Sequence, residues 1–304
     1  MRIIEPNVEI IPQSQGLEGV YKQIELAGRT AYKSEDKITE DSAEKFVNML
    51  IKRKHNAALE HGTIYLTYKG KWAGDTFVDF YEGNPYSNVD VEYVRDKYEN
   101  GWLMCLYHIT TNYRVIIENN RLKDLKYLSS PCKFHVKRHT AKFILSRGIA
   151  NEFVRHRVFS FLQESTRYCN YSKDKFKGVA FIASVDCPLE VGNYTLNEDV
   201  DIIKDGDIYI SNKTIEELSP EEAMLYAYCT SEQLYLALID KGIKPQIARD
   251  ALPLGLKTEL IMTGTTKQWR DFLNLRCASN AHPDAINLAL KLETLLAHIK
   301  NYDG

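Results

Sequence analysis

The order of strand-like and helical segments along the chain is the feature that most constrains its fold. Residues 63–69 alternate apolar and polar side chains with the period of a half-buried strand. Residues 17–32 instead carry apolar side chains at helical spacing, and Trp269, Phe272 and Leu273 form a similar stripe. The segments do not follow the strict strand–helix–strand rhythm of a doubly wound parallel sheet, so the pattern predicts an α+β fold.

The clearest element boundary is a helix that begins at Ser219. Ser219 is the predicted N-cap, Pro220 fits the first helical position, Glu222 completes a capping box, and Gly242 ends the helix. Asp41 predicts the start of another helix in the same way. Further strands are expected at 133–145, 178–184, 207–211 and 256–263, and further helices at 148–157, 267–277 and 283–300.

Residues 70–132 differ in composition from the rest of the chain. The stretch is rich in glycine, aromatic and acidic residues, and its run from 101 to about 120 predicts a helix. The chain has no internal repeat and no low-complexity tract. We therefore interpret residues 1–304 as a single domain with an insertion at about 70–132 that folds onto the main body.

Composition narrows the class of protein. The chain has 39 Lys and Arg against 41 Asp and Glu, a formal net charge of −2, which argues against a general nucleic-acid coat or a membrane-surface protein. No stretch approaches the roughly 18 apolar residues of a membrane span. The N-terminus lacks the basic start and apolar run of a signal peptide, and no glycine-rich phosphate loop of the Walker or Rossmann type is present.

The cysteines and histidines predict neither disulfides nor a metal site. Six cysteines are scattered without a Cys-x-x-Cys pair, which is typical of reduced, mostly buried thiols in a cytoplasmic protein. His135 and His139 have a spacing that would suit a metal on a helix. The surrounding residues favour a strand and supply no third carboxylate or thiol, so no metal is expected there.

Residues 155–168 carry the densest group of chemically active side chains. Arginine presents a planar fork that suits phosphate and the edge of a planar heterocycle. On one helix Arg155 and Arg157 would point about 200° apart, so they share a ligand only at a helix end or an interface, or else serve two ligands. A solvated basic helix face is the simpler alternative. Phe159 and Phe161 weaken it, because they anchor the segment in a core.

The sequence here resembles a known family. Arg-His-Arg at 155–157, followed after seven residues by Ser165, resembles the signature of the flavin-dependent thymidylate synthases. Residues 55–61, 248–253 and 275–283 resemble three further blocks of that family in the expected order. Four ordered blocks make a far more specific match than Arg-His-Arg alone.

The resemblance covers roughly residues 10–68 and 133–300, and it implies both a fold and an activity. The implied fold is α+β, with mixed helices and a mainly antiparallel sheet. The implied enzyme is a methyltransferase that converts dUMP to dTMP, with methylenetetrahydrofolate as carbon donor, FAD as hydride carrier and NADPH as reductant. Family members are homotetramers whose active sites combine residues of neighbouring subunits, and no nucleic-acid or membrane partner is expected.

The resemblance also implies which residues form the site. Those expected to bind FAD are Arg155, His156, Arg157, Gln163, His55 and Lys267. Those expected to bind dUMP are Gln163, Glu164, Ser165, Arg167, Arg249 and Arg276. Arg249 would reach the dUMP phosphate from a neighbouring subunit, and Arg276 would hold and polarise the pyrimidine. His55 could instead be a structural histidine near the start of a strand.

The implied mechanism needs no nucleophile from the protein. Ser165 is expected to bind phosphate, because a nucleophilic serine needs an adjacent general base and His156 is nine residues away. Cys169 is the cysteine nearest to the signature. It could be a reactive thiol beside Arg167, but a buried structural cysteine is the preferred interpretation.

Three departures from the family pattern leave an alternative open. Ala57 replaces a small hydroxyl residue, Gln246 an acidic one, and Asp271 stands where some relatives have asparagine. They are compatible with a catalytically silent relative that keeps dUMP or FAD as a regulatory ligand. A third reading is a module that binds RNA or single-stranded DNA through residues 155–168, where arginines and aromatic residues are interleaved.

Overall fold

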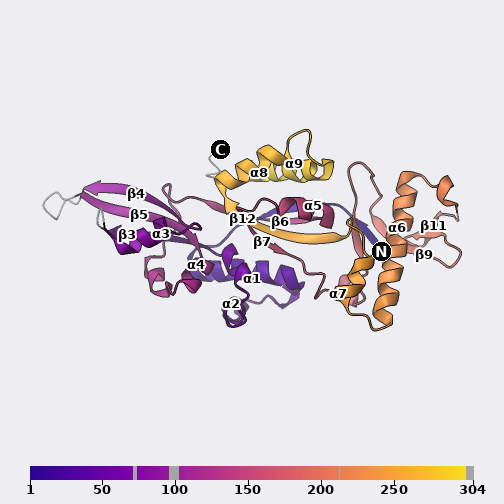
Figure 1. Cartoon of the computed structure of the whole chain (residues 1–304), viewed down its shortest axis with the longest axis horizontal. Helices are drawn as coiled ribbons and strands as arrows, with labels where there is room; N and C mark the ends of the chain where they lie inside the picture. The colour runs from indigo at the N-terminus through magenta and orange to yellow at the C-terminus, as the bar shows by residue number, and fades with distance from the viewer. Residues whose placement is uncertain (71–73, 96–102, 212, 299–304) are drawn as a thin grey trace.

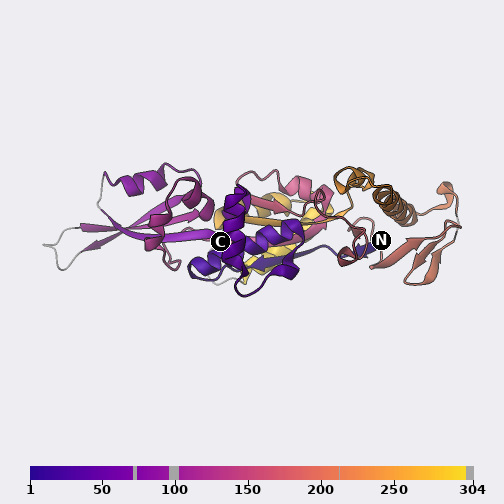
Figure 2. The ribbon, with the colours of Figure 1, turned by 90° about the horizontal axis from the view of Figure 1, so that it is seen from below.

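The computed structural model describes residues 1–70, 74–95, 103–211 and 213–298 of the 304-residue chain. The molecule is elongated, and three β-sheets follow one another along its long axis, with helices packed against them (Figure 1 and Figure 2). Among the described strand pairs, only that of β1 (Arg2–Ile4) with β8 (Ala180–Ile182) is parallel. The predicted α+β fold with mainly antiparallel sheets is confirmed.

The central sheet has the strand order β2-β6-β12-β7. Its strands are β2 (Asn7–Ile11), β6 (Arg138–Ser146), β12 (Lys257–Thr265) and β7 (Ser160–Gln163). The helices α8 (Thr266–Arg276) and α9 (Pro283–Ala297) cover one face, and α1 (Gly16–Tyr32) and α2 (Ser42–Lys52) lie on the other side (Figure 1). Phe143, Trp269 and Phe272 are fully buried in the core beneath α8, so the predicted stripe on this helix is a core stripe.

One end of the molecule is a three-stranded sheet of order β3-β5-β4. Its elements are β3 (Thr63–Gly70), α3 (Thr76–Glu82), β4 (Asn88–Arg95), β5 (Leu103–Asn112) and α4 (Tyr113–Glu118). The prediction of a helix from 101 to about 120 was wrong over β5. This strand pairs with β3 on one side and β4 on the other, and the helix starts only where the Asn112 side chain caps it. That residues 70–132 are an insertion remains a prediction.

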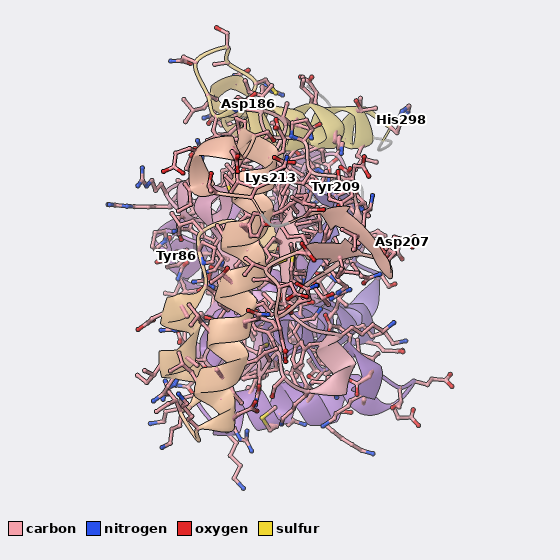
Figure 3. The ribbon with its side chains drawn as sticks, turned by 90° about the vertical axis from the view of Figure 1, so that its right-hand side faces the viewer. Tyr86, Asp186, Asp207, Tyr209, Lys213 and His298 are labelled. Carbon is pink, nitrogen blue, oxygen red and sulfur yellow. The ribbon has the colours of Figure 1, made fainter. Side chains whose placement is uncertain are left out.

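The other end combines a long helix with a five-stranded sheet of order β11-β10-β9-β1-β8 (Figure 1). Its remaining strands are β9 (Gly192–Leu196), β10 (Ile202–Lys204) and β11 (Asp207–Ile210). Asp207 and Tyr209 mark the edge strand β11 in Figure 3. The helix α6 (Pro220–Asp240) has the predicted capping box between Ser219 and Glu222. The cap predicted at Asp41 is wrong in one respect, because its side chain makes no bond to the start of α2.

The cysteines and the helices can be compared with what the composition predicted. All six cysteines are free. None of the helices in the described ranges combines the length and the apolar character needed to cross a bilayer.

A cluster of buried charges lies where α1, β6 and β12 meet. The Glu259 carboxylate of β12 accepts from Lys33 Nζ at 2.6 Å and Lys257 Nζ at 2.5 Å, and lies 3.0 Å from Lys142 Nζ. Lys257 also binds Glu164 Oε2 at 2.8 Å. Burial by itself raises the pKa of Glu259, but the ammonium groups of Lys257 and Lys33 outweigh it and hold the pKa at about 2. The folded chain therefore depends on Glu259 being ionised.

We predict that Glu259→Gln lowers the free energy of unfolding by roughly 3–5 kcal/mol at pH 7, because three ammonium groups lose their shared partner. The native pKa is depressed, so this contribution is fully present above the ordinary carboxyl value of 4.5 and is lost as the pH falls towards 2. The free energies of unfolding of wild type and variant, measured with denaturant at fixed protein concentration, should converge over that pH range. The control is Glu198→Gln, because Glu198 is exposed. Parallel pH profiles for wild type and Glu259→Gln would contradict the assignment.

Candidate functional site

The signature segment 155–168 includes β7, an edge strand of the central sheet. It follows the short helix α5 (Arg147–Phe153), which ends before Arg155, so the expected helix over 148–157 is too long at its C-terminal end. Further on, β7 pairs with β12 from Ser160 to Gln163. Arg155 and Arg157 therefore lie in an irregular turn. The expectation that their side chains point about 200° apart, which holds for a helix, does not apply to them. Both side chains are exposed, and neither has a hydrogen bond or ion pair to the described part of the chain.

His156 and Arg276 are in direct contact. Arg276 Nε donates to His156 Nε2 at 3.0 Å, and the same guanidinium binds the side chain and the carbonyl of Glu152, both at 2.7 Å. The imidazole also packs on the ring of Phe272, with 4.9 Å between ring centroids. Burial, and then the charge of Arg276, lower the pKa of His156. The imidazole is therefore neutral and accepts at Nε2. We call His156, Arg276 and Glu152 the imidazole group.

A second group contains three arginines, two of which donate to Thr166. Arg249 donates to Thr166 Oγ1 at 3.0 Å and Arg147 to the same oxygen at 3.5 Å. Arg167 donates to Gln246 Oε1 at 3.3 Å. Arg249 and Gln246 come from the turn formed by α7 (Pro245–Ala248) and the residues after it. Two guanidinium groups on one hydroxyl, with a third on the next residue, suit a multiply charged anion such as a phosphate monoester. We call these five residues the arginine group.

His55 lies beside the arginine group. Its Nδ1 atom is 3.0 Å from the hydroxyl of Tyr32, and the Tyr32 ring is 5.5 Å from that of Tyr168. The Arg167 guanidinium lies 5.5 Å above the Tyr168 ring. The aromatic side chains thus connect His55 at the start of one motif with Arg167 at the end of another. The exposed position of His55 leaves its ring accessible to a ligand.

The other predicted site residues have different surroundings. Ser165 is half-buried, and its backbone N–H donates to the carbonyl of Ala31 at 2.9 Å. Gln163 donates to Thr258 Oγ1 at 3.2 Å. Glu164 is buried in the charge cluster, where it pairs with Lys257. Lys267 is exposed on α8 and pairs at 2.9 Å with Asp271, one of the departures from the family pattern.

Sequence reasoning missed Arg147 and Tyr32 as members of this region. Arg147 precedes Thr166 by 19 positions and Tyr32 precedes Tyr168 by 136, so no linear spacing connects them. Thr166 was part of the matched pattern, but nothing in the sequence marked it as the residue that two arginines share. His61, in the block that contains His55, is fully buried against Thr263, with 2.8 Å between Nδ1 and Oγ1. Burial, together with Arg138, lowers its pKa to about 3.

Cys169 does not have the surroundings of a reactive thiol. It is 1 % exposed, and burial, together with the charge of Glu164, raises its pKa to about 12. The thiolate is the nucleophilic form of cysteine, so this side chain is an inert thiol at neutral pH.

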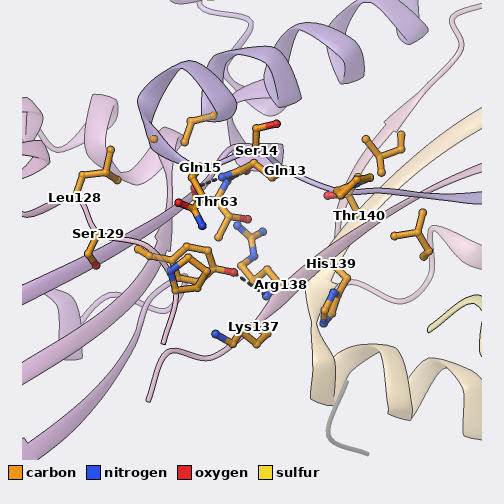
Figure 4. A pocket seen from close by; sticks show the side chains of 17 residues that line it. Gln13, Ser14, Gln15, Thr63, Leu128, Ser129, Lys137, Arg138, His139 and Thr140 are labelled. Atoms are coloured by element: carbon orange, nitrogen blue, oxygen red, sulfur yellow. Dashed lines mark hydrogen bonds between the residues drawn. The ribbon is translucent and has the colours of Figure 1, made fainter. Parts of the chain in front are cut away.

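A cavity of about 550 Å³ opens beside the start of β6. Figure 4 shows Gln13, Ser14 and Gln15 lining it from the segment before α1, and Lys137, Arg138 and His139 from the other side. Arg138 is half-buried and donates to the Glu60 carbonyl from both terminal nitrogens, at 3.3 Å. The residues that line this cavity include none of the predicted site residues.

The imidazole group and the arginine group are carried by different parts of the fold. Arg276 ends α8, on the upper side of the central sheet in Figure 1, whereas Arg249 follows α7 at the lower right. Each chain therefore has two separate groups of polar side chains that contain arginine. Both adjoin the signature segment, one at His156 and the other at Thr166 and Arg167.

Comparison with known proteins places this arrangement in context. Residues 133–299 match the family model described as thymidylate synthase complementing protein. The chain is 28% identical over 150 residues to a probable flavin-dependent thymidylate synthase of Paramecium bursaria Chlorella virus 1, covering 49% of this chain and 62% of that one. It is 27% identical over 152 residues to the flavin-dependent thymidylate synthase of Synechocystis sp., covering 50% and 62%. The chain thus spans less than two thirds of the length of these curated relatives.

Solved structures were also compared. A UMP/dUMP methylase, PolB from Streptomyces cacaoi bound with 5-Br dUMP, aligns with 98% of this chain and 92% of its own. The sequence identity is 18% and the TM-score 0.41.

Proposed function

The chain belongs to the thymidylate synthase complementing protein family, whose model covers more than half of its length, and from this premise we propose that it is a flavin-dependent thymidylate synthase. The reaction proposed is the reductive methylation of dUMP to dTMP, with methylenetetrahydrofolate as carbon donor and NADPH as reductant. The observation that carries the proposal is the position of the signature segment between the imidazole group and the arginine group. The curated relatives named flavin-dependent thymidylate synthases support it.

The residues at the signature segment fit FAD. Arg155 and Arg157 are exposed cations without partners in the described chain, and so are available to the anionic phosphates of the cofactor. The neutral ring of His156 lies next to them, and His55, Gln163 and Lys267 are proposed to complete the cofactor site. FAD, when bound, would supply the hydride chemistry that no amino-acid side chain can perform.

The arginine group fits the phosphate of dUMP. We assign Arg167, Arg249 and Ser165 to the phosphate, since a dianion in a partly buried site needs more than one cationic fork. Gln163 and Glu164 are proposed to line the rest of this pocket. Arg276 is proposed to hold and polarise the pyrimidine, which makes its carbon C6 a better hydride acceptor. In the free chain Arg276 is held in place by Glu152 and His156.

Residues from more than one chain are needed to complete this site. Arg276 and Arg249 are carried by different elements on different sides of the central sheet (Figure 1). A homotetramer in which the imidazole group of one subunit faces the arginine group of another would bring them to one nucleotide. The six free cysteines support a cytoplasmic location, where thiols stay reduced.

No side chain of the site is suited to attack the pyrimidine. Cys169 is buried and protonated, as described above. Ser165 would need a base to remove its proton, and His156 Nε2 instead accepts from Arg276. The protein is therefore proposed to bind and orient the substrates and to supply positive charge, without forming a covalent bond to dUMP.

The proposal predicts that the purified protein is yellow and that added dUMP accelerates oxidation of its reduced flavin in the presence of methylenetetrahydrofolate. Absorption spectra of the flavin, with chromatographic detection of dTMP, measure both. A colourless protein that fails to bind added FAD would refute the proposal. A flavoprotein that binds dUMP but forms no dTMP would be the silent relative instead. Salt-dependent binding of single-stranded nucleic acid without flavin would indicate the third reading.

Replacing Arg249 should weaken dUMP binding. Arg249→Met removes a charged hydrogen bond to phosphate, a contribution of about 1.5–3 kcal/mol, which corresponds to a rise of roughly 10–150-fold in KM for dUMP. The flavin content should not change. Lys123→Met removes an exposed cation from the β3-β5-β4 end of the molecule and is the matched control. An unchanged KM for dUMP in Arg249→Met would remove this residue from the phosphate site.

Replacing Cys169 should leave the reaction intact. Cys169→Ser and Cys169→Ala should form dTMP at rates of the same order as wild type, because the buried thiol takes no part in the chemistry. Circular dichroism and flavin content show whether the variants are folded. Loss of dTMP formation in both folded, flavin-loaded variants would show that the cysteine is a nucleophile.

A further inference from the structure

Three ligand-type side chains converge next to the β3-β5-β4 sheet, away from the proposed nucleotide site. The Cys132 Sγ atom lies 3.3 Å from Nδ1 of His108 and 3.2 Å from Nδ1 of His135. One ligand atom from each residue lies within 4.8 Å of the others. His108 and His135 are 5% and 3% exposed, and Cys132 is half-buried. The cluster is thus largely shielded from water.

The outer nitrogens of both rings have oxygen partners. His108 Nε2 lies 3.3 Å from the Glu92 carboxylate, and His135 Nε2 lies 3.0 Å from the backbone carbonyl of Leu66. Because these oxygens can only accept, each Nε2 carries the proton and each Nδ1 carries a lone pair. A carboxylate or carbonyl behind the outer nitrogen is the arrangement that orients histidines in metal sites.

The single thiol proton of Cys132 cannot form hydrogen bonds to both imidazole nitrogens that face the sulfur. The S–H proton of Cys132 can serve only one Nδ1 atom, and the backbone N–H of Cys132 donates to His135 Nδ1 at 3.1 Å. Whichever nitrogen the thiol proton serves, the other Nδ1 and the sulfur face each other with lone pairs at 3.2–3.3 Å. A cation bound by all three atoms would remove this repulsion.

We propose that His108 Nδ1, Cys132 Sγ and His135 Nδ1 bind one divalent cation of the zinc class, with water in the fourth position. Zinc–sulfur and zinc–nitrogen bonds of about 2.3 and 2.0 Å, at a tetrahedral angle, place sulfur and nitrogen about 3.5 Å apart. The two observed separations are 3.3 and 3.2 Å. Binding therefore needs both rings to shift, so that each sulfur–nitrogen separation lengthens slightly and the two Nδ1 atoms, which lie within 4.8 Å of each other, come to about 3.3 Å. It also replaces the Cys132 N–H bond to His135.

The charges around the cluster suit a divalent ion. A Cys132 thiolate and the Glu92 carboxylate together balance its two positive charges. Lys137 is a nearby cation, with Nζ 2.6 Å from the Cys132 carbonyl. The mixed imidazole and thiolate ligands favour zinc over magnesium or calcium.

The proposed site would fasten the end sheet to the central sheet. His108 is on β5, Glu92 on β4 and the Leu66 carbonyl on β3, whereas Cys132 and His135 lie in the segment that leads into β6. All three strands of the end sheet are therefore connected through the ion to the start of β6. His139, four residues after His135, is not part of the cluster, since its Nε2 lies 3.1 Å from Thr266 Oγ1. The proposal thus departs from the expectation that His135 belongs to no metal site.

The test uses the full-length chain without a histidine tag, stripped with EDTA and titrated with Zn²⁺ or with Co²⁺ as a spectroscopic probe. We expect about one ion per chain, a sulfur-to-cobalt charge-transfer band, and a higher melting temperature with zinc. Cys132→Ser and His135→Gln should abolish the charge-transfer band and the zinc-dependent thermal shift. Glu92→Gln should weaken binding by about 10–100-fold, as expected for a residue that orients a ligand.

Matched controls separate this site from other thiols and imidazoles. Cys187→Ser and His298→Gln, the latter near the C-terminus (Figure 3), lie outside the cluster and should bind zinc like wild type. Equal zinc uptake by wild type and Cys132→Ser, or a cobalt spectrum of the wild type without the charge-transfer band, would overturn the proposal. If Cys132→Ser does not fold, the wild-type cobalt spectrum and the Glu92→Gln titration decide. Flavin content and dTMP formation report on the proposed function separately.

Discussion

The antiparallel pairing of β6 with β12 is the constraint on which the rest of the structure depends. The two strands pair over nine residues, and β2 and β7 extend the sheet on either side. Two segments of the proposed site start from this sheet. The signature segment runs from the end of α5, which directly follows β6, through β7, and Arg276 lies at the end of the helix that follows β12. Since the sheet is rigid and its core is closely packed, the positions of these segments relative to one another are set by strand register.

The buried charge cluster adds a second constraint at the same place. Glu259 points from β12 towards lysines of β6, β12 and the end of α1. A one-residue slip of β12 would turn the carboxylate to the opposite face, away from the ammonium groups of Lys33 and Lys142. The cluster therefore opposes alternative registers, and it fixes Glu164, which follows β7, through Lys257. Charge pairing and strand pairing support the same arrangement.

Features that depend on local sequence could be predicted, and those that depend on distant contacts could not. The Ser219 capping box involves residues three positions apart, and the structure confirms it. The contact of Arg276 with His156 joins residues 120 positions apart, and neither side chain carries a local signal for the other. β5 was mistaken for a helix because its strand character depends on pairing with β3 and β4 on both sides. The cluster of His108, Cys132 and His135 could not be predicted for the same reason, since His108 contacts Cys132 only through the fold of the end sheet.

The positive and negative charges of this nearly neutral chain are distributed unevenly. Arg155, Arg157 and Arg167 lie exposed around the signature segment, whereas the acidic Glu164 and Glu259 are buried against lysines. The net charge of −2 thus hides a strong local imbalance, with exposed cations concentrated in the signature segment. Under the proposed function, a nucleotide bound between the imidazole group of one subunit and the arginine group of another interacts with both. Such a ligand binds the assembled form more tightly than the separate chain, so substrate binding and assembly stabilise each other by linkage.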